Sequence, residues 1–63
     1  SDRARTLAIV RAHIQIGRAI NLPPLTLCAR LIADLQLQGR TLTREETREV
    51  LALLIDGLQP TDP

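Results

Sequence analysis

The 63-residue sequence contains no aromatic residue, no methionine and no lysine. Without aromatic side chains, the core must be built from Leu, Ile, Val and Ala, a composition typical of helix bundles and coiled-coil-like seams. Apart from the single histidine, every basic residue is one of eight arginines. We interpret this preference for arginine as the codon bias of a GC-rich bacterial genome.

Cysteine and histidine each occur once, as Cys28 and His13. A disulfide within the chain is therefore excluded, and a closed zinc site, which needs four ligands, has too few candidates. A domain this short buries only about 60% of the surface of its unfolded chain, and small domains usually gain stability from disulfides, metals or partner subunits. The sequence thus predicts no metal and no cofactor, and it favours association with a protein partner or with a second copy.

Long apolar runs and a strong net charge are also lacking. The longest apolar run covers residues 50–55, far fewer than the roughly 20 residues that span a bilayer, and we recognise no targeting signal. The net charge of +1 gives no global attraction to nucleic acid or to a membrane surface. We expect a cytoplasmic protein that neither enters a membrane nor takes a small-molecule substrate.

What the sequence does have is helical periodicity. The apolar spacing predicts one domain over residues 1–59, with helices over 2–20, 24–38 and 43–57 and a frayed tail over 60–63. Each helix carries an apolar arc broader than the roughly 100° stripe of an ordinary surface helix. Three such arcs offer more apolar surface than one small core can hide, and a large exposed patch usually marks a partner. The predicted fold class is all-α, a small three-helix bundle completed by dimerisation or by a partner.

The ends of the predicted helices carry recognisable signals. The side-chain oxygen of Ser1 or Asp2 can cap the first helix. Pro23 disfavours helical backbone at Leu22, the residue before it, so the first helix is expected to end before this segment. Gly39 is the expected C-terminal cap of the second helix. The run Thr43-Arg44-Glu45-Glu46 has the spacing of a capping box at the start of the third.

The interface is predicted from the apolar arcs of the three helices. On the first helix it includes His13 and Gly17, and the missing side chain at Gly17 would let another helix approach closely. The full set of predicted interface residues is Leu7, Val10, His13, Ile14, Gly17, Leu31, Leu35, Val50, Leu54 and Leu58.

His13 is expected to pack at this interface with one ring nitrogen hydrogen-bonded. The surrounding residues Ala12-His13-Ile14-Gln15-Ile16-Gly17 also resemble the phosphorelay motif of histidine phosphotransfer domains, in which Leu, Lys and Gly follow the histidine. The resemblance implies that His13 accepts a phosphoryl group. Gln15 and Ile16 stand where that family has its Leu and Lys, so a degenerate histidine phosphotransfer domain is one alternative function.

No other group of residues predicts catalysis. Cys28 lies on an apolar face, where a free cysteine is commonly a small buried hydrophobe. Glu45, Glu46 and Glu49 open the third helix, where acidic residues favourably face the positive end of the helix dipole. We therefore expect that the chain is not an enzyme.

Arginines make the first predicted helix locally basic, at positions 3, 5, 11 and 18. Arginines on one helix face can contact phosphates, but no aromatic side chain is available to stack on single strands. The linker over residues 39–42 suits a helix-turn-helix, yet the third helix carries acids where a recognition helix needs base-reading donors. A small DNA-binding regulator is a second alternative, and binding to nucleic acid is not the expected function.

The third predicted helix has one further resemblance. Leu42-Thr43-Arg44-Glu45-Glu46, followed by Val50-Leu51-Ala52-Leu53-Leu54, loosely resembles the helical docking segments of modular polyketide and nonribosomal peptide synthase subunits. Those segments carry a Thr or Ser cap, paired acids and a Leu-rich helix. The resemblance covers about a third of the chain and implies subunit recognition by helix packing. We expect a non-catalytic protein–protein interaction module, either a docking or dimerisation domain or a small adaptor or regulator.

Overall fold

A computed structural model of the chain describes residues 1–59 and contains three α-helices. They are α1 (Asp2–Ala19), α2 (Pro24–Leu37) and α3 (Arg44–Gly57), and no strand occurs in this part of the chain. The predicted all-α three-helix bundle is confirmed, and every helix end lies within one residue of its predicted position. The tail predicted over 60–63 lies outside the described residues.

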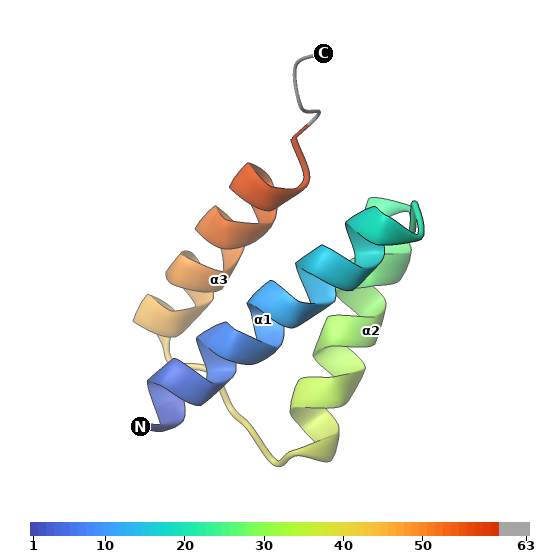
Figure 1. Cartoon of the computed structure of the whole chain (residues 1–63). Coiled ribbons are helices and arrows are strands. Elements are labelled where there is room, and N and C mark those ends of the chain that lie inside the picture. The colour runs from blue at the N-terminus through green and yellow to red at the C-terminus, as the bar shows by residue number, and fades with distance from the viewer. Residues whose placement is uncertain (60–63) are drawn as a thin grey trace.

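The central element of the bundle is α1 (Figure 1). It packs against both α2 and α3, whereas no Cα atom of α2 lies within 8 Å of a Cα atom of α3. In Figure 1 the two outer helices flank α1 and are joined by an extended segment that passes near its N-terminal end. The bundle is therefore closed on the side of α1 and open between α2 and α3.

The core lies where α1 meets the two outer helices. Burying one large aliphatic side chain there stabilises the fold by roughly 1.5–3 kcal/mol. A buried hydroxyl, that of Thr6, donates to the Asp2 carbonyl at 2.9 Å and accepts from Arg40 Nη2 at 2.6 Å, so its polar atom is paired. The buried apolar residues are Val10, Ile14, Leu27, Leu31, Leu35, Val50 and Leu54.

Two glycines let α1 approach its neighbours closely. A Cβ atom at Gly17 would overlap Leu27 Cδ1 of α2, which confirms the close approach predicted at this position. On the other side, a Cβ atom at Gly57 of α3 would lie 2.7 Å from Ile14 Cγ2. Gly57 thus supplies a second close contact, which helical periodicity alone does not indicate.

Both α1 and α2 end in Schellman motifs, in which a left-handed residue follows the helix. After α1, Asn21 has a φ of 56°, and the next N–H donates back to the Gly17 carbonyl at 2.8 Å. After α2, Gly39 has a φ of 67°, and the next N–H donates back to the Leu35 carbonyl at 2.9 Å. The predicted cap at Gly39 is confirmed. The end of α1 is formed by its own cap at Asn21, before the effect expected from Pro23 begins.

The N-terminal caps also match the sequence. Ser1 Oγ accepts from the Ala4 N–H at 3.2 Å and caps α1. Thr43 and Glu46 form the predicted capping box, because each accepts from the backbone N–H of the other at 3.1 Å. This reciprocal pair fixes the residue at which α3 begins.

Candidate protein-binding groove

An apolar groove lies between α2 and α3, on the open side of the bundle. It encloses about 250 Å³, which is below the roughly 300–1,000 Å³ of sites for drug-sized ligands. The described residues that line it include no charged side chain. A groove of this kind suits the side chains of a packed helix. Its lining is Cys28, Leu31, Ile32, Leu35, Leu42, Thr47, Val50, Leu51 and Leu54.

The groove exists because α1 covers only part of each apolar arc. The centres of the arcs face α1, where Leu31 is 2% exposed and Leu54 8%. Residues at the flanks stay outside: Ile32 is 55% exposed, Leu51 52% and Ile55 63%. Ile32 and Leu51 line the groove from opposite helices, and Ile55 follows Leu51 by one turn.

The predicted interface residues lie mostly in the core of the single chain. Val10, Ile14 and Gly17 belong to the contact of α1 with the outer helices. The other buried members of the set also line the groove, and they are Leu31, Leu35, Val50 and Leu54. The exposed residues of the groove walls, Ile32 and Leu51, were on the predicted arcs but not in the predicted interface set. Buried are Val10, Ile14, Gly17, Leu31, Leu35, Val50 and Leu54, and half-buried are Leu7, His13 and Leu58.

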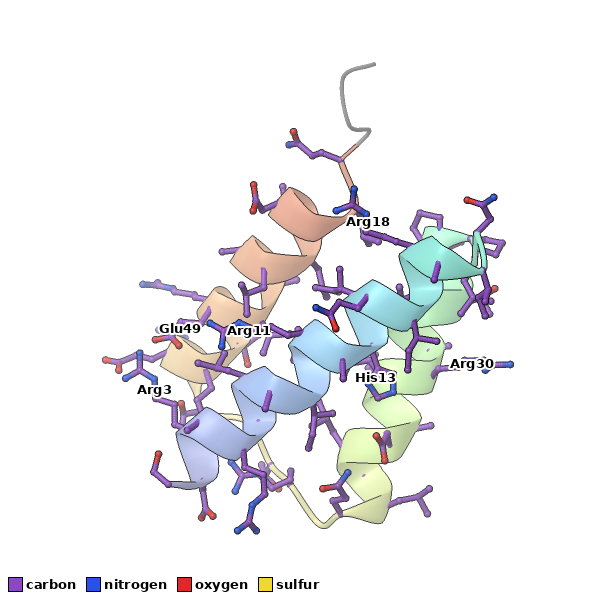
Figure 2. All side chains as sticks on the ribbon, viewed as in Figure 1. Arg3, Arg11, His13, Arg18, Arg30 and Glu49 are labelled. Carbon is purple, nitrogen blue, oxygen red and sulfur yellow. The ribbon has the colours of Figure 1, made fainter. Side chains whose placement is uncertain are left out.

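His13 lies between α1 and α2 (Figure 2), and it does not line the groove. Its Nδ1–H donates to the Ile9 carbonyl at 2.9 Å, which confirms the predicted packing with one ring nitrogen bonded. Its Nε2 lies 3.5 Å from Asp34 Oδ2. A carboxylate beside this nitrogen would repel an incoming phosphoryl group, so the arrangement does not favour the phosphotransfer alternative.

Arg40 ties the connection between α2 and α3 to the first turns of α1 and α3. Its Nη1 lies 3.2 Å from Asp2 Oδ2 and its Nη2 lies 3.5 Å from Glu46 Oε2. Nη2 also donates to the Asp2 carbonyl at 2.9 Å. The side chains of Arg40 and Glu46 are only 16% and 15% exposed. This cluster, the Arg40 clamp, fixes how α3 starts relative to α1.

The arginines of α1 do not form an uninterrupted basic face. Arg3 is paired with Glu49 of α3, as Figure 2 shows. Arg11 and Arg18 are exposed farther along the helix. The acidic side of α3 thus lies beside the basic side of α1, which weakens the case for contacts with phosphates.

Metal-ligand clusters, membrane spans and matches to known proteins also bear on the function of the chain. Within residues 1–59, no group of three or more His, Cys, Asp or Glu could hold a metal ion. None of the three helices in this range has the length and hydropathy needed to cross a membrane. Neither protein-family models nor curated proteins nor solved structures match this chain. The groove and the charges beside it are the observations from which function is inferred.

Proposed function

We propose that the chain is a non-catalytic protein–protein interaction module whose binding surface is the groove between α2 and α3. The supporting observation is that Ile32, Leu51 and Ile55 are each more than half exposed beside a lining without charge. Covering apolar surface gains roughly 25 cal/mol per Å². A protein partner that covered these side chains would recover this free energy.

Two forms of this function fit the chain. It can be a docking or dimerisation domain of a larger bacterial protein, as the resemblance of α3 to synthase docking segments suggests. It can also be a small cytoplasmic adaptor or regulator. In both forms Leu51 and Ile55 of α3 contact the partner, and no cofactor or reaction is involved.

A selection for groove binders tests the proposal. A displayed library of random helical segments is panned against the wild-type chain and then against Leu51→Glu, which places a carboxylate on the groove wall. The control is Leu37→Glu, because Leu37 is 86% exposed and does not line the groove. We expect enriched segments that bind the wild type and the control but not Leu51→Glu. Equal binding to all three chains, or no enrichment, would contradict the proposal.

A further inference from the structure

The two edges of the groove differ in charge. On α3, Arg44 and Arg48 are exposed and lie one turn from the lining residues Thr47 and Leu51, since residues three and four apart are neighbours on a helix. The ion pairs in residues 1–59 involve neither of these arginines. On α2, the exposed neighbours of Ile32 are the uncharged residues at positions 29 and 36.

The acidic residues of the outer helices lie elsewhere. Glu45, Glu46 and Glu49 line a polar hollow at the N-terminal end of α1. Asp56 lines a second hollow on the α1 side, and Asp34 of α2 lies beside the histidine of α1. The groove is therefore bordered by positive charge from α3 and by no negative charge from the described residues of either helix.

We propose that the groove binds an amphipathic helix of another protein that carries acidic residues along one flank of its apolar stripe. The apolar stripe covers Ile32, Leu51 and Ile55, and the acidic flank lies along Arg44 and Arg48. Helices that lay an apolar face into a groove are a recurrent mode of recognition, and complementary charge adds specificity and faster association. This inference rests on the proposed interaction function and adds the chemistry of the partner.

A second copy of the chain fits the charges less well. If two grooves faced each other, each copy would bring Arg44 and Arg48 to the interface. The carboxylates of both copies would stay on their α1 sides, as the positions of Glu49 and Asp56 show. Positive charges brought together without acids are unfavourable. Charge therefore favours a different protein as the occupant.

The test uses two cross-linked helical peptides with the same length and the same leucine stripe. One peptide carries Glu along the flank of the stripe and the other carries Lys. Binding to the wild-type chain is measured by fluorescence anisotropy at low and at high salt. At low salt we expect the Glu peptide to bind about three- to tenfold more tightly, which is the strength of two exposed ion pairs. The difference should shrink at high salt because the arginines are exposed.

Charge-reversal variants assign this preference to named residues. The double variant Arg44→Glu, Arg48→Glu should reverse the order of the two peptides. The matched control is Arg11→Glu, Arg18→Glu, which changes two exposed arginines of α1 that do not line the groove. The control should keep the wild-type order of binding.

Substitutions in the groove walls assign the binding to the groove. Leu51→Glu on α3 and Ile32→Glu on α2 should each weaken both peptides by about tenfold or more, because a carboxylate would have to be buried beneath the leucine stripe. Both residues are more than half exposed, so the helical circular dichroism of the two variants should match that of the wild type.

Several outcomes would overturn the acidic-helix assignment. They are equal binding of the two peptides at low salt, tighter binding of the Lys peptide, and binding of neither. Sedimentation equilibrium of the chain alone provides a further contradicting outcome. If the chain forms a dimer that Leu51→Glu abolishes, the occupant of the groove is a second copy of the chain. In each of these cases, the interaction function would still be supported if the displayed library yields segments that bind the wild-type chain but not Leu51→Glu. The two proposals can therefore be contradicted independently of each other.

Discussion

Helices α2 and α3 each present two apolar sides, one facing α1 and one facing the groove. Both sides are built mainly from aliphatic residues, yet only the side that faces α1 is covered by another helix. Toward α1, Leu27 of α2 is 1% exposed and does not line the groove. Toward the groove, Ile32 and Leu51 are more than half exposed. The difference lies in helix spacing, because Gly17 lets α1 come close, whereas the Cα atoms of α2 and α3 stay more than 8 Å apart. Both surfaces are apolar, so hydropathy does not distinguish them. The distance between the helix backbones decides which surface is buried in the core and which stays open as the groove.

The largest effect should come from truncating matched leucines on the two sides. Leu27→Ala, at a core side chain that does not line the groove, should lower the free energy of unfolding by about 2–5 kcal/mol, through lost burial and the cavity that remains. Leu51→Ala, at a side chain that is 52% exposed, should change it by about 0.5 kcal/mol or less. Urea titration followed by circular dichroism measures both values. Equal losses would mean that Leu51 is already covered in solution and that the groove is not open.

The close approach of α1 predicts the next largest effect. Gly17→Ala should lower the free energy of unfolding by about 1–2 kcal/mol, since overpacking costs about 1–3 kcal/mol and the better helix propensity of alanine returns up to about 1 kcal/mol. Gly57→Ala should cost less, because its new methyl group meets Ile14 at a longer distance. Gln15→Ala, on the exposed side of α1, is the control and should be nearly neutral. A stabilised Gly17→Ala chain, measured by its Tm, would refute the tight contact between α1 and α2.

The contrast between the two sides also shows what the sequence could predict. Helix ends were predictable because local groups form them: the Thr43–Glu46 capping box and the left-handed turn at Gly39 depend on nearby residues only. The end of α1 was placed correctly for a different reason, since the cap is formed by Asn21 rather than by the proline that follows. A left-handed asparagine is less common than a left-handed glycine and gives a weaker signal.

The groove could not be located from the sequence, because helical periodicity gives the width of an apolar arc and not the part that a neighbour covers. Leu54 and Ile55 are adjacent on the same arc of α3, yet they are 8% and 63% exposed. Which of them is buried depends on the packing angle of α1, which is set by distant contacts such as Ile14 against Gly57. The predicted interface therefore contained arc centres that lie in the core, and four of them also line the groove: Leu31, Leu35, Val50 and Leu54.

The Arg40 clamp gives a third test, with an expected effect of similar size, because it holds the end of the bundle where the groove begins. Arg40→Ala should lower the free energy of unfolding by about 1–2 kcal/mol, since the buried Thr6 hydroxyl and the mostly buried Glu46 carboxylate lose a partner. Arg3→Ala is the matched change at a side chain that is 60% exposed, and solvent screening should limit its cost to about 0.5 kcal/mol or less. If urea titration gave both variants the same loss, the clamp would be no more than a surface ion pair.

The smallest effect is expected at His13, which lies on the closed side of the bundle. His13→Leu should leave the free energy of unfolding within about 0.5 kcal/mol of the wild type, because replacing a half-buried polar ring by an apolar side chain of similar size is nearly neutral. Binding of the Glu peptide should also be unchanged, since His13 does not line the groove. His13→Asp should destabilise the fold, because it would place a second carboxylate near Asp34. A loss of peptide binding in His13→Leu would move the interaction surface to the α1–α2 side.

The same residue separates an interaction module from a phosphoryl carrier. A carrier histidine needs a ring nitrogen whose lone pair is free to attack phosphorus, but Nδ1 is engaged by the Ile9 carbonyl and Nε2 faces the Asp34 carboxylate. Incubation with a phosphorylated response-regulator receiver should therefore leave no acid-labile phosphate on the chain. Asp34→Asn sharpens the experiment, since it removes the negative charge beside Nε2 and leaves the Ile9 contact in place. Label on the wild-type chain that disappears in His13→Leu would make the closed side the functional one. Label on Asp34→Asn alone would show that Asp34 is the group that prevents phosphorylation, and the interaction module would stand.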